Sequence, residues 1–469
     1  MKAKRIAACA LALTMSIGTV ASFTGCGSSN DSSSSKAAGT TKAEDESAID
    51  KTGEYTKVDG KGAKIVVYTN RTDRVDDGSL AKRTEAFEKD NNCTVEYQAL
   101  KDYSGDIKKK LSSGDYGDVL MIPDDVQLDD LKNYFEPLGS YDDLSKEYKW
   151  TNKKMDSSKT VYGLPYGGNA VGILYNKKVW SDAGITETPK TPDEFIEDLK
   201  KIKEKNGDAV IPYYTNYKDD WAITQWDSLV LSASGDAEYK TNLLKNKTDL
   251  FDKDGGYYKT YKFLYDLYSQ KDLLEEDHTT TDWENSKVVF DKGGIGAMVM
   301  GSWAIGQFQD VAAKNNLNPD DIGYMPVPIT AADGKQYSQT SGDMCLGVSK
   351  NSKNKELAKA YIEWFLKASG FASSEGMIPT VVGSELPDNL SEFNGVELFE
   401  EAETPDEYIG VFDNIDKKVS KIDLSGNASD NFKFKLAEAA FAGESEDSMQ
   451  KVFDDLNKKW ADARDSVVK

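Results

Sequence analysis

Residues 160–199 have the sequence TVYGLPYGGNAVGILYNKKVWSDAGITETPKTPDEFIEDL, in which several structural signals follow one another in a fixed order. A first predicted strand ends at residues 163–165. The next four residues, 166–169, include two glycines, which can adopt backbone angles that other residues avoid. An apolar run at residues 171–175 then predicts a buried strand. We therefore expect the chain to cross here from one compact body to another through a hinge.

The second half of this stretch predicts two helices. A short helix follows Asn176 and ends near Gly184. Thr191 and Glu194 have the spacing of a capping box, in which each side chain accepts a hydrogen bond from the backbone N–H of the other residue, and Pro192 takes the first helical position. The helix that they begin is amphipathic, with an apolar face of Phe195, Ile196, Leu199 and Ile202.

Strands and helices alternate in the part of the chain that precedes this stretch. Residues 64–70, 94–97 and 119–122 are predicted strands, the last of them an apolar run, and helical patterns lie between them. Such alternation favours parallel strands with helices on both faces of the sheet. The chain after residue 62 is longer than the ~250–300 residues that one hydrophobic core usually serves, so two domains are expected.

Six short motifs follow one another along the chain. They are YGLP at residues 162–165, LYNK at 174–177, AGI at 183–185, PKTPDEF at 189–195, FDKGGIGAMVMGSW at 290–303 and GMIPT at 376–380. In this order they resemble the carbohydrate-binding group of extracellular solute-binding proteins, the maltose-binding-protein-like receptors of bacterial ABC importers. The resemblance covers residues 63–469. It implies an α/β, two-lobe periplasmic-binding-protein-like fold of type II, in which each lobe is a mainly parallel sheet flanked by helices and a hinge joins the lobes.

The resemblance also implies how the chain is divided between the lobes. DIGYMPVP, residues 321–328, resembles the second crossing, which we expect at residues 324–328. The N-terminal lobe is therefore expected at residues 63–168 and 326–380, and the C-terminal lobe at residues 169–325 and 381–469.

The first 62 residues predict export and anchoring. Residues 1–25 combine a basic head with an apolar stretch, the pattern of a signal peptide that is too short for a lasting membrane span. Phe23-Thr24-Gly25-Cys26 resembles a lipobox, so Cys26 is expected to carry acyl chains such as palmitate at the outer face of a bacterial cell membrane. Ordinary secretion with cleavage elsewhere is the alternative. Residues 26–62 have almost no large apolar side chain and are expected to form a disordered tether.

Charge and cysteine content exclude several classes of protein. The formal net charge of −22 repels nucleic acid and anionic lipid. Beyond the expected lipidation site only Cys93 and Cys345 remain, too few for a disulfide framework. His278 is the only histidine, so histidine-based catalytic triads and multi-histidine zinc sites have no support. We expect a monomer without cofactor or metal.

Candidate ligand-binding residues come directly after predicted strands, because ligands of open α/β sheets bind at the carboxyl ends of strands. Sugars present hydroxyl groups and an apolar ring face. Carboxylates, amides and arginine can bind the hydroxyl groups while aromatic rings cover the face. By this rule the polar candidates are Asn70, Arg71, Asp73, Asp124 and Asp125 in the N-terminal lobe. Asp343, which follows Ser341 and Gly342, is a further candidate. The resemblance adds Tyr166 and Asn169 at the first crossing, which line up with positions near the ligand in that family.

Three tryptophans are the aromatic candidates. Trp303 follows Gly301 and Ser302 at a predicted strand-to-helix junction, where a ring beside two small residues can stand clear of the core. The family that the chain resembles carries sugar-stacking aromatic residues at this G-x-W position. Trp221 and Trp226 lie near the start of a predicted helix and are further candidates, with a place in the core as the alternative for each.

The resemblance implies a binding protein rather than an enzyme. Such a protein would hold a sugar or oligosaccharide in the cleft between two lobes and deliver it to the permease subunits of an ABC importer. We expect the lobes to close on the ligand, with Gly167 and Gly168 giving backbone freedom at the first crossing or, alternatively, a tight turn that requires glycine. A secreted, lipid-anchored glycoside hydrolase is the alternative function, since its cleft would also combine aromatic rings with carboxylates. No local motif supports a catalytic pair.

Overall fold

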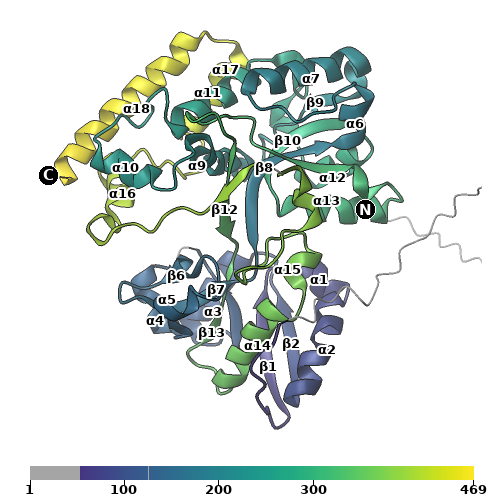
Figure 1. Ribbon diagram of the computed structural model, residues 1–469, viewed down its shortest axis with the longest axis vertical. Coiled ribbons are helices and arrows are strands. Elements are labelled where there is room, and N and C mark those ends of the chain that lie inside the picture. Colours follow the sequence, from purple (N-terminus) through teal and green to yellow (C-terminus); the bar gives the residue numbers. More distant parts are fainter. Residues whose placement is uncertain (1–52, 125, 394, 469) are drawn as a thin grey trace, which may run out of the picture. The chain divides into compact units, whose positions relative to one another are not determined.

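The computed structural model describes residues 53–124, 126–393 and 395–468. These residues form two β-sheets with helices packed around each of them (Figure 1). The predicted two-lobe α/β fold is confirmed. The predicted signal peptide, Cys26 and Asp125 lie outside the described residues, so the expectations about them stay predictions.

The N-terminal lobe is built on a sheet with the strand order β2-β1-β3-β13-β7-β5. In this sheet β1 pairs in parallel with β2 and β3, whereas β13 pairs antiparallel with β3 and β7. Two short strands extend it, since β4 pairs with β13 and β6 with β7. The strands are β1 (Ala63–Thr69), β2 (Cys93–Ala99), β3 (Val119–Ile122), β4 (Phe135–Glu136), β5 (Gly139–Ser140), β6 (Lys154–Met155), β7 (Thr160–Pro165) and β13 (Cys345–Ser349).

The C-terminal lobe is built on a second sheet with the strand order β14-β12-β8-β10-β9, and β11 pairs with β8 as well. The long strand β8 is central, with antiparallel pairing to β10, β11 and β12. The parallel pairs of this sheet are β9 with β10 and β12 with β14. The strands are β8 (Gly168–Asn176), β9 (Ile211–Tyr213), β10 (Ile295–Gly301), β11 (Ile322–Pro326), β12 (Tyr337–Gly342) and β14 (Glu397–Phe399).

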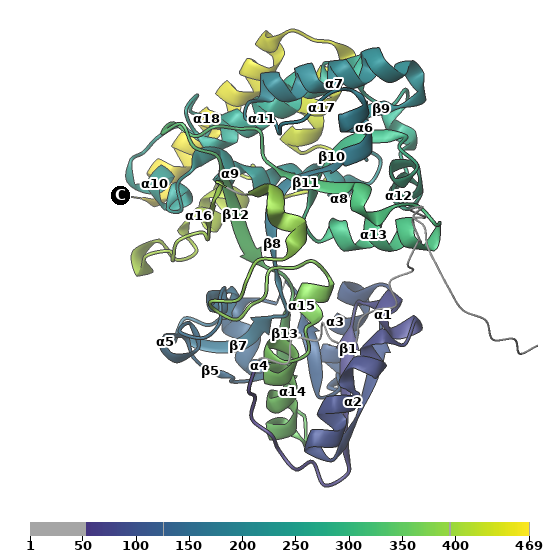
Figure 2. The same ribbon diagram turned by 45° about the vertical axis from the view of Figure 1, so that its right-hand side comes forward.

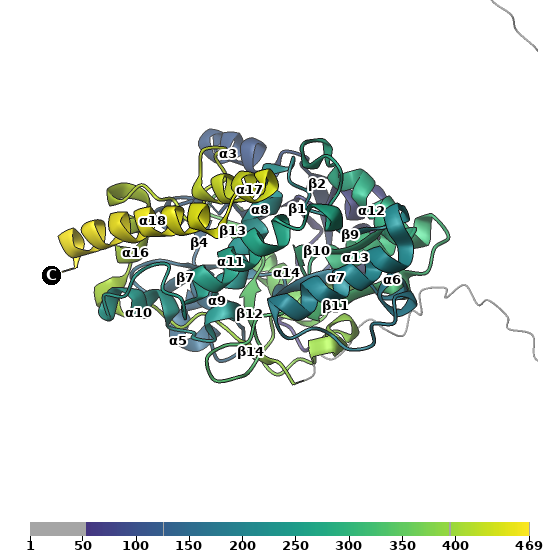
Figure 3. The ribbon, with the colours of Figure 1, turned by 90° about the horizontal axis from the view of Figure 1, so that it is seen from above.

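Helices cover both sheets, and Figure 3 shows α7, α11, α17 and α18 in the view from above the C-terminal lobe. The helices of the N-terminal lobe are α1 (Thr72–Asp76), α2 (Ser79–Asn91), α3 (Tyr103–Ser113), α4 (Leu131–Tyr134), α5 (Tyr141–Leu144), α14 (Lys355–Lys367) and α15 (Phe371–Ser374). Those of the C-terminal lobe are α6 (Lys177–Asp182), α7 (Pro192–Asn206), α8 (Asp220–Ile223), α9 (Leu229–Ser234), α10 (Tyr239–Lys245), α11 (Gly256–Tyr268), α12 (Trp283–Asp291), α13 (Ala304–Lys314), α16 (Val411–Asp413), α17 (Phe432–Ala442) and α18 (Glu446–Val467).

The expectation that both sheets are mainly parallel is wrong, because both are mixed. The reason lies in how the chain changes lobes. It passes directly from β7 to β8 and from β12 to β13, without a crossover helix. Strands β1 and β3 end at the edge of the N-terminal sheet where β13 begins, so β13 must run in the opposite direction.

The first crossing lies where the sequence predicts it, between β7 and β8, but the second does not. The expected crossing at residues 324–328 is wrong, since β11 is paired with β8 inside the C-terminal sheet. The chain returns to the N-terminal lobe only at Asp343 and Met344, between β12 and β13. The second segment of the N-terminal lobe therefore begins near residue 345 instead of residue 326. The chain leaves that lobe again only after Val382, whose backbone N–H donates to the carbonyl oxygen of Glu147, and Leu390 already packs in the core of the C-terminal lobe.

The glycines of the first crossing make room for neighbouring side chains. Neither Gly167 nor Gly168 has a positive φ in this arrangement of the lobes, so the backbone angles seen here do not by themselves require glycine. A Cβ atom on Gly168 would lie 2.1 Å from the indole ring of Trp150, and one on Gly167 would lie 3.1 Å from Met377. Position 168 therefore requires glycine because Trp150 fills its surroundings, whereas a side chain at position 167 would need Met377 to shift slightly.

Three crossing segments are tied together at this point (Figure 2). In β8, Gly168 is paired with Gly342 of β12, and the backbone N–H of Asp343 donates to the carbonyl oxygen of Gly167 at 2.8 Å. On the other side, Gly168 and Ile378 exchange two backbone hydrogen bonds of 2.8 Å each. The segments that join the lobes are thus one hydrogen-bonded ribbon, against which Trp150 packs.

The helix that follows the first crossing has the predicted capping box. The Thr191 side chain accepts a hydrogen bond from the Glu194 backbone N–H, and the Glu194 side chain accepts one from the Thr191 backbone N–H. All four predicted core residues of this helix are buried: Phe195, Ile196, Leu199 and Ile202.

The predicted tether ends earlier than residue 62, because residues 53–62 lie against the N-terminal lobe. The ring of Tyr55 packs on Phe87, with centroids 6.1 Å apart. The backbone N–H of Val58 donates to the Asn91 side chain at 2.7 Å. Tyr55 and Val58 are large apolar residues in an otherwise polar stretch, and these contacts attach it to the folded lobe.

Candidate functional site

Polar candidates from both lobes meet at the ribbon of crossing segments. Asn169, in β8, donates through Nδ2 to Asp343 Oδ2 at 2.7 Å. Ser302, which follows β10, donates through Oγ to Asn169 Oδ1 at 3.3 Å. The second oxygen of Asp343 accepts from the backbone N–H of Met344 at 2.7 Å. Asn169 and Asp343 are therefore held in fixed orientations while both stay partly exposed.

Residues that follow β1 extend this group into the N-terminal lobe. Asn70 donates through Nδ2 to the sulfur of Met344 at 3.4 Å, so it lies next to the second crossing. Arg71 donates two hydrogen bonds to Asp73, of 3.0 Å and 2.7 Å. The Arg71 guanidinium also lies 5.5 Å from the ring centre of Phe371. A bidentate pair of this kind fixes the direction of the arginine fork.

Tyr166, the first residue after β7, is buried against the same group. Its ring contacts Phe371 edge to face, with centroids 5.7 Å apart. Burial raises the pKa of the Tyr166 hydroxyl well above its usual value, and the negative charge of Asp343 raises it further. Tyr166 therefore stays neutral and keeps a proton that it can donate in a hydrogen bond.

Arg71 and Asp73 each stabilise the charged form of the other. Burial by itself would lower the pKa of Arg71, but its hydrogen bond to Asp73 and the charge of Glu375 outweigh burial and raise it. For Asp73, burial works in the opposite direction, and the hydrogen bond and charge of Arg71 bring its pKa below the usual value. Both groups are thus charged at neutral pH.

Asp124 lies at the same edge of the sheet, after β3, and 72% of its side chain is exposed. The nearest cation is Lys154, whose Nζ lies 3.7 Å from Asp124 Oδ1. The carboxylate is thus open to solvent.

Three tryptophans form a cluster at the strand ends of the C-terminal lobe. Trp303 directly precedes α13, Trp221 lies in α8, and Trp283 begins α12. The ring centroids are 5.2 Å apart for Trp221 and Trp283, 6.0 Å for Trp221 and Trp303, and 5.8 Å for Trp283 and Trp303. All three side chains are half-buried. Their partly exposed rings offer an apolar surface beside Ser302, which hydrogen-bonds to Asn169.

Trp226 does not belong to this cluster, so its prediction as a ligand-binding residue is wrong. It is 1% exposed in the core of the C-terminal lobe. Its ring packs edge to face on Phe263 and Tyr268, at centroid distances of 5.3 Å and 5.9 Å. A ligand cannot reach a side chain that the core covers.

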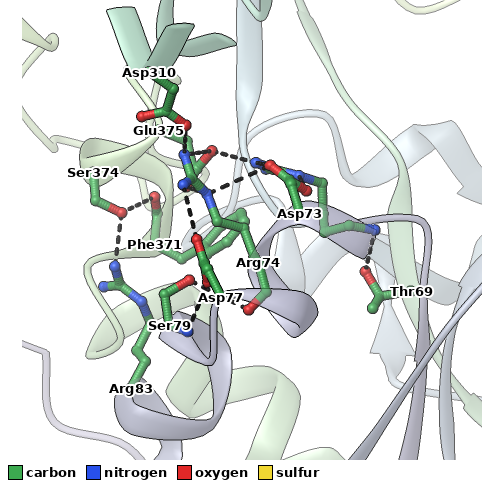
Figure 4. Close-up of polar contacts among 11 residues, drawn as sticks. Thr69, Asp73, Arg74, Asp77, Ser79, Arg83, Asp310, Phe371, Ser374 and Glu375 are labelled. Carbon is green, nitrogen blue, oxygen red and sulfur yellow. Dashed lines mark hydrogen bonds and ion pairs between the residues drawn. The ribbon is translucent and has the colours of Figure 1, made fainter. Parts of the chain in front are cut away.

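Four residues of this region were not predicted from the sequence. Trp283 could have been found from the sequence, because Asp282 before it is a typical helix-capping residue. A tryptophan in the first turn of a helix is a candidate for a partly exposed ring. Arg74, Asp310 and Glu375 form a charged network with Arg71 (Figure 4). No local signal reveals such a network, because Glu375 lies about 300 positions along the chain from the two arginines that it binds.

The arrangement suits binding of a neutral polar ligand with an apolar face. Charged and amide groups with fixed orientations can bind hydroxyl groups, and partly exposed indole rings can cover a sugar ring. In the part of the chain that the structure describes, no group of three or more His, Cys, Asp or Glu side chains is placed to hold a metal ion. Within the same residues, no helix combines the length and the apolar character that a membrane span requires.

Comparison with known proteins connects this geometry to a family. The model of the family described as "Bacterial extracellular solute-binding protein" matches residues 72–370. One similar structure is BlMnBP1, a binding protein of an ABC transporter from Bifidobacterium animalis subsp. lactis, which was solved in complex with mannobiose. Its sequence is 33% identical to this chain, and the superposition has a TM-score of 0.77. The match covers 89% of this chain and 100% of BlMnBP1. BlMnBP2, a manno-oligosaccharide specific solute binding protein of the same organism solved with mannotriose, is 32% identical over 86% of this chain and 95% of its own, also with a TM-score of 0.77.

A curated relative matches over a shorter length. The diacetylchitobiose binding protein DasA of Streptomyces coelicolor is 31% identical over 212 residues, which are 44% of this chain and 46% of DasA. The match therefore spans about half the length of this curated relative. The family model, in contrast, covers more than half of this chain, including the first and second crossings between the lobes. The chain belongs to the bacterial extracellular solute-binding proteins.

Proposed function

We propose that this protein binds an oligosaccharide between its two lobes, outside the cytoplasm, and delivers it to the permease subunits of an ABC importer. The observation that carries the proposal is the cluster of Trp221, Trp283 and Trp303 beside the hydrogen-bonded Asn169 and Asp343. The cluster supplies apolar faces for sugar rings, and the polar pair supplies partners for hydroxyl groups. We take the protein to act as a monomer.

The first ligands to test follow from the similar structures. BlMnBP1 and BlMnBP2 were solved with mannobiose and mannotriose, and the likeness of this chain to each extends over nearly all of that protein. We propose that manno-oligosaccharides, or oligosaccharides of similar length, bind this protein. More than one indole in the cluster favours a ligand with more than one ring.

The test is thermal unfolding of the purified protein with and without each sugar of an oligosaccharide panel that includes mannobiose, mannotriose, raffinose and chitobiose. A ligand that binds only the folded state stabilises it by about 2.7 kcal/mol at a concentration 100 times its Kd. We expect at least one oligosaccharide to raise the Tm by several degrees, with free mannose as the single-ring comparison. Failure of the whole panel at millimolar concentration would contradict the proposal.

We also propose that the protein does not change its ligand chemically. The family and the similar structures are described as binding proteins, which leaves the glycoside hydrolase alternative without support. After overnight incubation, mass spectrometry should recover the stabilising sugar intact. Turnover that remains after further purification and exceeds a mock preparation would favour the hydrolase.

The lipid anchor on Cys26 is part of the proposal. The lipobox-like sequence Phe23-Thr24-Gly25-Cys26 supports it, and two acyl chains on one residue are enough for stable anchoring. In a bacterial host, the unchanged protein should take up labelled palmitate and sediment with membranes, whereas Cys26→Ser should lose the label and appear in the soluble fraction. Cys93→Ser, which removes a buried thiol, is the control and should keep both properties. A labelled Cys26→Ser protein would show that acylation occurs elsewhere.

A further inference from the structure

One arginine of the N-terminal lobe forms ion pairs with carboxylates of both lobes (Figure 4). Arg74 lies in α1, and its Nε is 2.8 Å from Oε1 of Glu375, the residue that follows α15 in the same lobe. Its Nη2 is 2.7 Å from Oδ2 of Asp310, which lies in α13 of the C-terminal lobe. A single guanidinium thus joins the two lobes.

The N-terminal half of this network is rigid. Glu375 is buried and accepts hydrogen bonds from Arg74 Nη2 at 3.2 Å and from Arg71 Nη2 at 2.6 Å. Arg71 is in turn bound to Asp73 through two hydrogen bonds. The residues next to Glu375 are fixed as well, since Phe371 and Ala372 pack in the core of the N-terminal lobe.

This rigidity makes the contact to Asp310 more effective than an ordinary surface pair. An exposed ion pair contributes little because two flexible side chains must be ordered to form it. Arg74 is already oriented by Glu375, and its planar guanidinium loses little further freedom when Asp310 approaches. On the other side, α13 is anchored in the core of the C-terminal lobe through Ala304, Ile305 and Phe308.

The backbones of the two lobes approach each other at the same place. A Cβ atom on Gly306, in the first turn of α13, would lie 3.2 Å from the backbone carbonyl oxygen of Glu375. Asp310 lies one helical turn beyond Gly306, so its carboxylate and this backbone contact belong to the same face of the boundary between the lobes. In Figures 1 and 2, α13 lies next to α1 and α15 accordingly.

We propose that Arg74 is an interlobe clasp, with Glu375 as its fixed partner in the N-terminal lobe and Asp310 as the partner that it releases. While Arg74 binds Asp310, the lobes keep the arrangement of this structure. When they rotate apart, the contact to Asp310 breaks and the contact to Glu375 stays. The clasp therefore biases the ratio of the two arrangements in the absence of ligand. It does not depend on which ligand the protein binds.

The clasp can be tested by measuring a distance across the boundary in the full chain without ligand. Nitroxide labels are placed on Lys82→Cys in α2 and Ala313→Cys in α13, both exposed positions, with Cys9 and Cys26 replaced by serine. Cys93 and Cys345 are buried and are left in place. Electron–electron double resonance measures the distance between the two labels. In the unchanged protein, the main population should have the distance that this structure predicts. Asp310→Asn should lower the ratio of this population to the longer distances about three- to fivefold.

A matched variant separates the clasp from a general effect of charge. Asp266 pairs with Lys262 at 2.7 Å inside the C-terminal lobe, so Asp266→Asn removes the same charge from the same lobe without touching the boundary. It should leave the distance distribution unchanged. In an Arg74→Gln background, Asp310→Asn should have no further effect, because the two residues act as one pair. An unchanged distribution in Asp310→Asn, an equal change in Asp266→Asn, or additive effects of Arg74→Gln and Asp310→Asn would each overturn the clasp.

Discussion

Trp303→Ala should weaken binding of the stabilising oligosaccharide by about tenfold or more while the protein stays folded. The ring is half-buried beside Trp221 and Trp283, so its loss removes an exposed apolar surface without opening the core. Aromatic contacts contribute ~0.5–1.5 kcal/mol beyond the area that they bury. Together with the lost apolar area, a total of about 1.4 kcal/mol or more is expected, which corresponds to a tenfold change in Kd. Isothermal titration calorimetry gives the Kd, and circular dichroism checks the fold.

Trp226 is a matched control for this experiment, because it is the same residue type in the same lobe but lies in the core. Trp226→Ala should destabilise the protein by about 3–5 kcal/mol, the usual cost of removing a large buried ring. The two variants thus separate binding from stability. An unchanged Kd in Trp303→Ala would show that the ring does not contact the ligand, and unfolding of this variant would assign the ring to the core.

Asp291→Asn should stabilise the protein at pH 8 by about 1–3 kcal/mol, because a buried carboxylate without a partner costs more than the neutral amide that replaces it. Asp291 is the last residue of α12 and is 7% exposed. Neither of its carboxylate oxygens finds a hydrogen-bond partner among the described residues. Burial raises its pKa from 3.8 to about 7. At pH 8 the folded protein therefore contains a buried negative charge that asparagine would remove.

The sign of the pH dependence follows from the raised pKa. Between pH ~4 and ~7 the folded state binds a proton at Asp291 more tightly than the unfolded chain does, so this residue makes stability rise as the pH falls through that range. Urea unfolding at pH 5, 7 and 8 should show the largest gain for Asp291→Asn at pH 8 and a smaller one at pH 5. Asp320→Asn, an exposed change, should be neutral at each pH. If the gain in stability did not vary with pH, the pKa of Asp291 would not differ between the folded and the unfolded protein in this range, and the prediction would be wrong.

Local patterns predicted the parts of the fold that depend on neighbouring residues. The capping box of Thr191 and Glu194, the strand at residues 119–122 and the first crossing all lie where the sequence placed them. The prediction of the second crossing at residues 324–328 failed because an apolar run with prolines is equally compatible with a strand inside a sheet. Nothing within residues 321–328 indicates that β11 pairs with β8, since that pairing depends on residues far away in the sequence.

The same limit applies to the candidate site. Trp221 and Trp226 are five residues apart, so on a helix of 3.6 residues per turn they point in different directions and only one can face a ligand. The sequence alone does not say which of them does, and the structure places Trp226 in the core. Glu375 carries no recognisable motif and takes part in the site only because folding brings it to Arg71 and Arg74.

The hydrogen-bonded ribbon between the lobes limits how they can move. Because Gly168 is paired with Gly342 on one side and with Ile378 on the other, the three connections cannot slide past one another without breaking backbone hydrogen bonds. Trp150 fills the space against Gly168, so there is also no room for the ribbon to buckle there. We therefore expect relative motion of the lobes to be mainly rotation about one axis that passes through these connections. If the proposed permease subunits recognise this protein by its shape, they would need to read a single coordinate, the angle between the lobes.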